Sequence, residues 1–117
     1  MATLALLVDG VLVNSFPLDA EETRIGRAAD NEIRIDDLAV SGHHARIERI
    51  PNRYMDGIND YFLRDLGSTN GTLVNGQRIE RIHLRPEDEI RIGWNTFKLV
   101  DEQQQPMDKT AYILPDD

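Results

Sequence analysis

The sequence predicts an all-β protein, a β-sandwich of two antiparallel or mixed sheets built from about ten or eleven short strands. No segment of ten or more residues repeats apolar side chains at helical spacing. Short apolar runs alternate instead with turn residues at close intervals. The length of 117 residues fits one domain. We expect residues 1–100 to form that domain and residues 101–117 to form an acidic, flexible tail.

Two dipeptides mark β-hairpins. Asp9-Gly10 separates the apolar runs 4–8 and 11–16, and Asn75-Gly76 separates 72–74 from 77–79. These residue pairs accommodate the positive φ angles of a two-residue hairpin turn. The polar stretch 51–60 is expected to be an exposed insertion between two strands. The other expected strands are 24–25, 33–35, 45–47, 61–66, 90–92 and 97–99.

The composition narrows the classes of function. A net charge of −8 disfavours general binding to nucleic acid, which needs many Lys and Arg contacts with phosphates. The absence of cysteine excludes disulfides and thiolate metal sites, and it suits a reducing compartment. The N-terminal apolar run lacks a basic leader and is too short to span a bilayer. We therefore expect a cytoplasmic protein that has neither a membrane nor a nucleic-acid partner.

Three loops carry residues suited to holding an anion. The first contains Gly26-Arg27, the second Ser41-Gly42-His43-His44, and the third Ser68-Thr69-Asn70-Gly71. Glycine lets backbone N–H groups approach a ligand, hydroxyls donate to phosphate oxygens, and arginine offers two parallel charged N–H groups. Each loop taken alone is more simply explained as a turn. The combination of all three is what indicates a binding site.

The order and spacing of these residues closely resemble the signature of the forkhead-associated (FHA) domain family over about residues 4–100. Gly-Arg is followed by Ser-x-x-His, then by Ser-x-Asn-Gly-Thr, with Asn-Gly three residues on. The flanking segments 24–33, 63–72 and 88–93 match as well. The resemblance implies an FHA/SMAD-like sandwich that recognises phosphothreonine segments to assemble signalling partners, without catalysis or cofactor. The alternative is an interaction scaffold whose phosphate pocket is unused.

The resemblance also implies roles for the matching residues. Arg27 would clamp the phosphate, while Ser41 and Thr69 would add hydrogen bonds to it. Asn70 would hold the main chain of the bound peptide. The residue after the binding serine is Gly42, so only its backbone N–H can contribute. The residues expected to support the loops are Gly26, His44, Ser68, Gly71 and Asn75.

The implied partners are phosphothreonine-containing proteins, among them a Ser/Thr kinase or its substrates. A pocket for the threonine methyl group would favour phosphothreonine over phosphoserine by about 0.8 kcal/mol. In the tail, Ile113 stands three residues after Thr110, the position that FHA domains often read. Phosphorylated Thr110 would therefore allow self-association through the same pocket. The simpler interpretation is a tail threonine that no kinase modifies.

Two other kinds of site deserve a structural test. Ser41, His44 and Asp65 are the residue types of a hydrolytic triad, although no nucleophile motif surrounds Ser41. The histidines His43, His44 and His83 could in principle bind a metal ion, but adjacent residues on a strand face opposite ways. We expect neither a catalytic nor a metal site.

Overall fold

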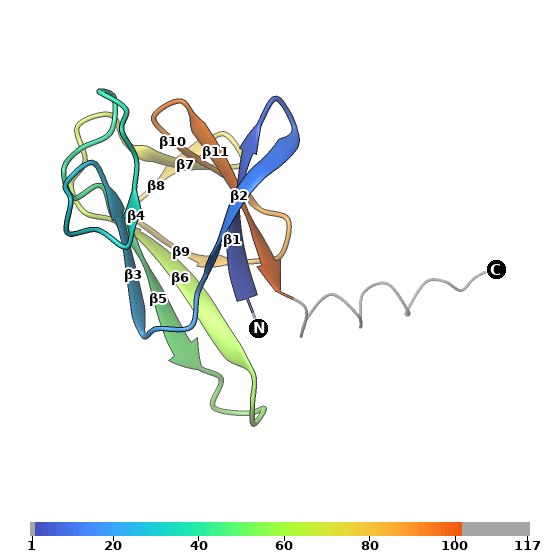
Figure 1. Ribbon diagram of the computed structural model, residues 1–117. Helices are drawn as coiled ribbons and strands as arrows, with labels where there is room; N and C mark the ends of the chain where they lie inside the picture. Colours follow the sequence, from blue (N-terminus) through green and yellow to red (C-terminus); the bar gives the residue numbers. More distant parts are fainter. Residues whose placement is uncertain (1, 102–117) are drawn as a thin grey trace.

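The computed structural model describes residues 2–101 and confirms the predicted all-β class (Figure 1). This part of the chain contains no helix, so it offers no helical segment that could cross a membrane. In chain order the strands are β1 (Ala2–Val8), β2 (Val11–Pro17), β3 (Glu22–Gly26), β4 (Ile33–Arg34), β5 (Ala45–Pro51), β6 (Asn59–Asp65), β7 (Thr72–Val74), β8 (Gln77–Ile79), β9 (Arg81–Leu84), β10 (Glu89–Ile92) and β11 (Asn95–Asp101).

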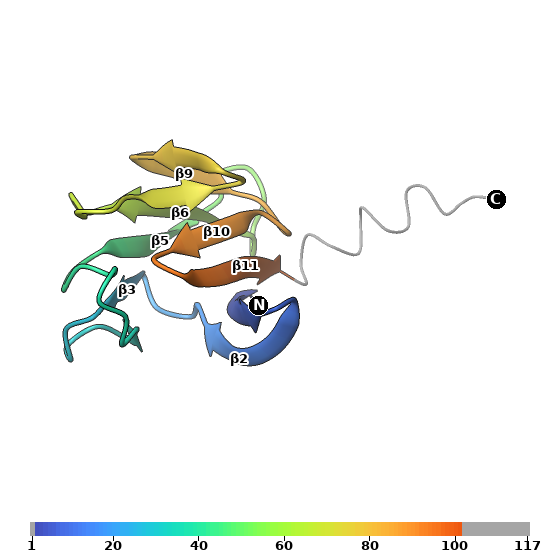
Figure 2. The same ribbon diagram turned by 90° about the horizontal axis from the view of Figure 1, so that it is seen from above.

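The strands form two sheets that pack face to face as a sandwich (Figures 1 and 2). One sheet has the order β2-β1-β11-β10-β7-β8, and the other has the order β4-β3-β5-β6-β9. Every neighbouring pair is antiparallel except β3 and β4, which are parallel. The first loop (27–32), the second loop (35–44) and the third loop (66–71) lie together at one end, and the β5–β6 turn lies at the other.

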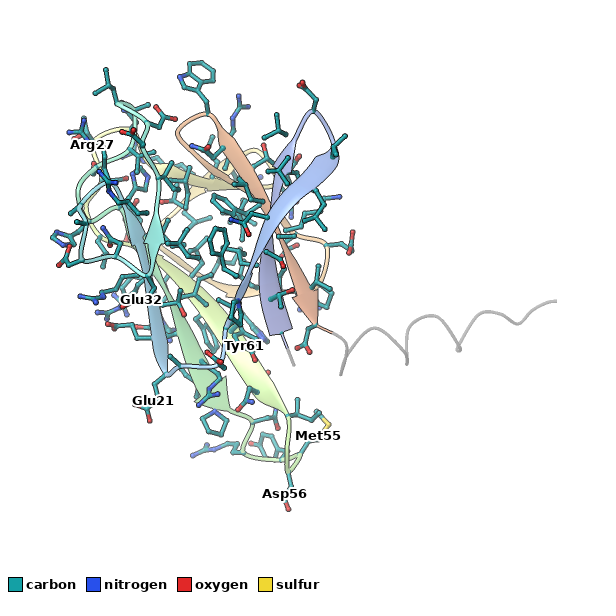
Figure 3. All side chains as sticks on the ribbon, viewed as in Figure 1. Glu21, Arg27, Glu32, Met55, Asp56 and Tyr61 are labelled. Carbon is teal, nitrogen blue, oxygen red and sulfur yellow. The ribbon has the colours of Figure 1, made fainter. Side chains whose placement is uncertain are left out.

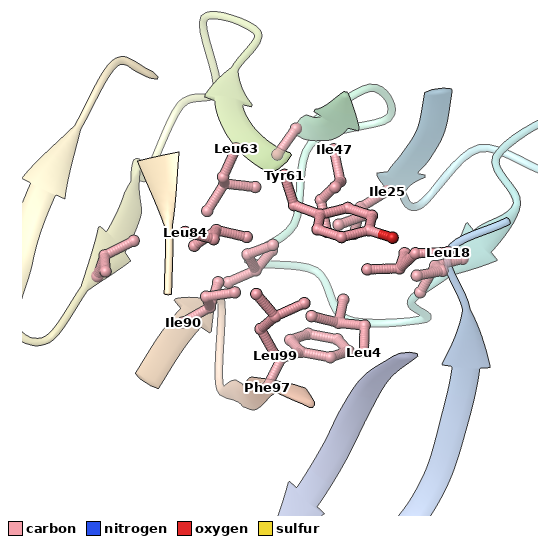
Figure 4. Close-up of a cluster of buried hydrophobic side chains, with 14 of the residues drawn as sticks. Leu4, Leu18, Ile25, Ile47, Tyr61, Leu63, Leu84, Ile90, Phe97 and Leu99 are labelled. Carbon is pink, nitrogen blue, oxygen red and sulfur yellow. The ribbon is translucent and has the colours of Figure 1, made fainter. Parts of the chain in front are cut away.

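The core fills the space between the sheets. Leu4, Phe97 and Leu99 contribute from the six-stranded sheet, and Ile25 and Leu63 contribute from the five-stranded sheet (Figure 4). Each of these side chains is 0% exposed, because residues two apart on a strand share a face and the apolar set all points inward. The sandwich is thus a rigid base from which the loops project.

Both predicted hairpin turns are confirmed. The φ angles of Asp9 and Gly10 are 52° and 77°, and those of Asn75 and Gly76 are 51° and 83°. Two successive positive φ values are the signature of the type I′ turn, whose twist matches that of the flanking strands.

Two sequence expectations were wrong in detail. Strand β9 was not predicted, because a single residue, Glu80, separates it from β8 while the chain passes from one sheet to the other. The expected insertion at 51–60 is shorter than its polarity indicated. Pro51 pairs with Asn59, so β5 and β6 extend into this stretch and only 52–58 remains outside them. The predicted tail lies outside the described residues, apart from Asp101, which ends β11.

We expect Leu63→Ala to lower the free energy of unfolding by about 2–5 kcal/mol, because it leaves a cavity between the sheets. Leu38→Ala is the matched control, since Leu38 is 89% exposed and its truncation should change stability by less than about 0.5 kcal/mol. Chemical denaturation of both variants tests this. If both variants lose the same free energy of unfolding, the assignment of Leu63 to the core is contradicted.

Candidate functional site

The first and second loops are joined through their backbones. The Arg27 N–H donates to the Ser41 carbonyl oxygen at 3.0 Å, and the Ala28 N–H donates to the Gly42 carbonyl oxygen at 3.1 Å. A Cβ at Gly26 would collide with that same Gly42 oxygen, so this close approach requires glycine. Arg27 and Ser41 are therefore held side by side, as a shared site demands.

The buried side chain of Asn31 reinforces this junction. Its Nδ2 donates at 2.8 Å to the carbonyl oxygens of both Ala28 and Gly42. This role could not be predicted from local sequence, because Asn31 lies in a polar turn that any exposed residue could fill.

The second and third loops are joined by His44, which is 0% exposed. Its Nδ1 accepts a hydrogen bond from the Ser41 N–H at 3.0 Å, and its Nε2 lies 2.9 Å from the carbonyl oxygen of Gly71. A carbonyl can only accept, so Nε2 carries the proton and the ring is the neutral Nε2–H tautomer. The imidazole of His44 thus joins the backbones of the second and third loops.

The third loop is shaped by the carboxylate of Asp65. One oxygen accepts from the N–H groups of Gly67 and Ser68 at 3.0 and 3.1 Å. The other accepts from the hydroxyls of Ser68 and Thr72 at 2.5 and 2.8 Å. Burial favours the protonated acid, but these hydrogen bonds outweigh it and hold the pKa of Asp65 below its ordinary value.

Ser68 and Gly71 complete the loop. The Ser68 hydroxyl oxygen accepts from the Gly71 N–H at 3.0 Å, which closes the turn around Thr69 and Asn70. Gly71 has a φ of +88°, where a side chain would be strained, and the Arg78 side chain lies against it. Both supporting positions predicted here therefore have a physical basis.

The predicted phosphate ligands line one exposed surface. The Thr69 N–H donates to the Ser41 Oγ at 3.1 Å, which leaves the Ser41 hydroxyl proton free to donate outward. Arg27 is exposed, and its guanidinium forms no hydrogen bond or ion pair with any residue in 2–101. Figure 3 shows Arg27 at the loop end of the molecule, far from Asp56 at the opposite end.

A second arginine, whose place at this site the sequence did not predict, lies beside Arg27. Arg34 lines the same shallow depression as Arg27 and Gly42, and its Nε donates to the Arg27 carbonyl oxygen at 3.1 Å. Asp36 also lines this depression and supplies one opposing charge. The alternation of apolar and polar residues in 33–35 predicted only that Arg34 faces outward. That Arg34 lies beside Arg27 depends on how β4 pairs with β3, and local sequence does not show this pairing.

Next to the predicted phosphate ligands is an apolar depression. Asn70 lies on its rim, and its Nδ2 donates to the Ala39 carbonyl oxygen at 2.9 Å. Leu73 and Trp94 provide the apolar wall, and the Arg91 guanidinium lies over the Trp94 ring at 5.6 Å.

The Trp94 turn is tied to the second loop through Asp37. One carboxylate oxygen accepts from the Trp94 N–H at 3.0 Å, and the other accepts from the Ala39 N–H at 2.8 Å. These backbone hydrogen bonds keep the pKa of Asp37 below its usual range. The apolar depression is thus anchored to the second loop, which also carries the predicted phosphate ligand Ser41.

The structure therefore brings together nine of the predicted residues and places one, Asn75, apart from them. Asn75 is at the far end of β7, where it bonds to Asp88 and Glu89 rather than to the three loops. Thr110 lies outside the described residues. The nine residues that gather are Gly26, Arg27, Ser41, Gly42, His44, Ser68, Thr69, Asn70 and Gly71.

The geometry of a hydrolytic triad is absent from the described residues. His44 bonds to the Ser41 backbone and not to its hydroxyl, and the Asp65 carboxylate bonds to Ser68 and Thr72. Residues 2–101 also contain no group of three or more His, Asp or Glu side chains placed to hold a metal ion.

Comparison with known proteins gives consistent relatives. EmbR, a transcriptional regulatory protein of Mycobacterium tuberculosis, is 40% identical over 95 residues, which cover 80% of this chain and 23% of EmbR. The glycogen accumulation regulator GarA of the same organism is 39% identical over 85 residues, which cover 73% of this chain and 47% of GarA. The chain thus spans less than half the length of these relatives.

Solved structures agree with the sequence matches. The FHA domain of FhaA, in complex with the intracellular domain of another protein, has a TM-score of 0.71 and 33% identity, covering 86% of this chain and 100% of that one. EmbR of M. tuberculosis in complex with a low-affinity phosphopeptide has a TM-score of 0.70 and 37% identity, covering 84% of this chain and 24% of that one. The family model of the FHA domain matches residues 23–93. The chain belongs to the FHA domain family.

Proposed function

We propose that this chain binds protein segments containing phosphothreonine and so assembles signalling partners. The observation that carries the proposal is the exposed Arg27 guanidinium, which has no anionic partner in residues 2–101 and belongs to a residue whose backbone is hydrogen-bonded to that of Ser41. A phosphate group carries about −1.5 to −2 charge at neutral pH and three strong acceptor oxygens, which match this donor set.

The roles follow from the donors. Arg27 forms the charge-assisted hydrogen bonds, and Ser41 donates its remaining proton to another phosphate oxygen. Thr69 adds its hydroxyl. Arg34 contributes a second positive charge at the same depression, which offsets the absence of a polar side chain at Gly42.

The peptide main chain is held by Asn70, which is positioned by its bond to Ala39. The depression lined by Leu73 and Trp94 then accepts an apolar or aromatic side chain of the peptide, because it is the apolar surface next to Asn70. Phosphate recognition and sequence preference are thereby assigned to neighbouring parts of one surface.

The partners that fit this chemistry are a Ser/Thr kinase or its substrates, and the domain itself performs no catalysis. A cysteine-free chain suits a reducing compartment, so we place this recognition in the cytoplasm. Phosphorylated Thr110, in the tail at 101–117, would be one such ligand, in cis or on a second copy. Binding of a phosphorylated peptide of residues 104–117 tests that idea, and no measurable affinity would remove it.

Arg27→Ala should weaken binding of a phosphothreonine peptide by about 1.5–3 kcal/mol, or roughly 10- to 150-fold, because one charged partner is lost. Arg53→Ala is the matched control, since Arg53 is an exposed arginine in the 52–58 turn. Calorimetry against a phosphothreonine peptide library identifies the ligand and measures both variants. If no phosphopeptide binds better than its unphosphorylated form, the domain is a scaffold with an unused pocket.

Asp65→Asn should lower both phosphopeptide affinity and the free energy of unfolding, the latter by about 1–3 kcal/mol, because the amide has one acceptor oxygen in place of two. The folded-state pKa of Asp65 is lowered, so its stabilisation is complete above the ordinary carboxyl pKa and is lost as the pH falls through the lowered value. The difference in the free energy of unfolding between the wild-type protein and Asp65→Asn should therefore become smaller as the pH falls. If this difference stays constant down to a pH of about 2, the prediction is contradicted.

A further inference from the structure

A row of arginines crosses the outer face of the five-stranded sheet. Arg24 pairs with Arg46, Arg46 with Arg64, and Arg64 with Arg81, so one arginine from each of β3, β5, β6 and β9 stands in register. Like charges directly opposite on a sheet repel and destabilise the pairing. The row therefore needs anions to offset it.

The chain supplies these anions unevenly. At the β3 side, Arg24 pairs with Glu32 at 2.7 Å, and Arg46 pairs with Glu22 at 3.1 Å. At the β9 side, Arg64 and Arg81 have one ion-pair partner between them within the described residues, the carboxylate of Glu48, which already contacts Arg46 at 3.0 Å. The arginines toward β9 are therefore paired less completely than those toward β3.

Glu48 is shared by the two remaining arginines of the row. It lies 3.2 Å from Arg81 and 3.6 Å from Arg64. The second distance is too long for a hydrogen bond, and the buried Nε of Arg64 has no hydrogen-bond partner among the described residues. A buried N–H donor without a hydrogen-bond partner is energetically costly, so the Arg64 Nε lacks an acceptor that a ligand could supply.

A third guanidinium reaches the same place from the other sheet. Arg78 of β8 lines an open depression together with Arg64 and Arg81. It forms no hydrogen bond or ion pair with the part of the chain that the structure describes. Arg81 is held in place by packing over the Phe62 ring, 4.3 Å from its centre. Three arginines from three strands therefore line one depression.

Two carboxylates, those of Asp65 and Glu80, also line this depression and oppose an incoming anion. The charge of Asp65 is partly offset by the hydrogen bonds that it accepts within the third loop and from Thr72. Glu80 is exposed and makes no hydrogen bond or ion pair through its side chain within residues 2–101. It is the natural target for a substitution that should strengthen anion binding.

We propose that the depression formed by Arg64, Arg78 and Arg81 is a second anion-binding site, which takes a carboxylate or phosphate group of the protein bound at Arg27. Its wall includes Gly67, and Arg78 lies against Gly71, so the third loop contributes to both sites. Three arginines suit one or two oxyanion groups of a protein, whereas a nucleic acid would meet repulsion from a surface of net charge −8. The second anion site can exist whether or not the proposed function is correct. That the same partner occupies both sites rests on the proposed function.

The first experiment isolates the second site. The full chain carrying Arg27→Ala is titrated with inorganic phosphate at constant ionic strength, and NMR follows the Gly67 amide and the arginine Nε–Hε signals. We expect saturable shifts at Gly67 and at Arg64. Arg78→Gln should weaken this binding about tenfold, Arg78→Lys should retain most of it, and Glu80→Gln should tighten it.

Shifts that do not saturate, or an affinity unchanged by both Arg78→Gln and Glu80→Gln, would overturn the second site. Denaturation midpoints of the variants show that each remains folded. Loss of phosphopeptide binding in the wild-type chain would reject the proposed function and leave this titration unaffected.

The second experiment asks whether one partner uses both sites. The ligands are a short phosphothreonine peptide, the same peptide extended by glutamates, and the same peptide extended by a second phosphothreonine. Arg78→Gln should reduce the affinity of an extended peptide about tenfold more than it reduces that of the short peptide. The extended peptide that responds identifies carboxylate or phosphate as the natural group. If neither extended peptide binds more tightly than the short one, the same-partner proposal fails.

Discussion

The imidazole of His44 holds the second and third loops at a fixed separation, because its two ring nitrogens bond to the backbone of both. Without it, the Ser41 N–H and the Gly71 carbonyl oxygen would be left without partners at a buried position, which is expensive. Ser41 and Asn70 acquire their positions from this link. The side chains that we propose to bind the phosphate and the peptide main chain are therefore positioned by a buried residue that is not itself proposed to bind.

The sequence was sufficient to predict features whose cause is local. The Asn75-Gly76 turn follows from the φ angles these residues tolerate, and Gly26, Ser41 and His44 were identifiable from their spacing. The contribution of Arg34 was not predictable in this way. Its place beside Arg27 depends on the parallel pairing of β3 with β4, which no local pattern encodes. The resemblance to a family with a common loop arrangement predicted which loops lie together, and the periodicity of apolar residues alone could not do this.

Strand pairing also explains the errors in the fold. Residues 81–84 alternate as a strand should, but Glu80 is not a typical turn residue, so the change of sheet was hidden. Pro51 ends β5 at the tip of a long hairpin where its missing N–H is tolerated, although its polar neighbours indicated a loop. In both places the partner strand, and not the composition, decided the outcome.

Arginine placement reconciles an acidic chain with anion recognition. At physiological salt, charges more than about 8 Å apart in solvent are largely screened, so a bound oxyanion responds mainly to the guanidinium groups beside it. The register of β5, β6 and β9 determines which arginines lie side by side. If the strands were shifted by one residue, Arg64 and Arg81 would point into the core and Leu63 would be exposed. The same hydrophobic alternation that buries the apolar side chains therefore aligns the charged row. Fold and electrostatics here have one cause, the pairing of β5, β6 and β9.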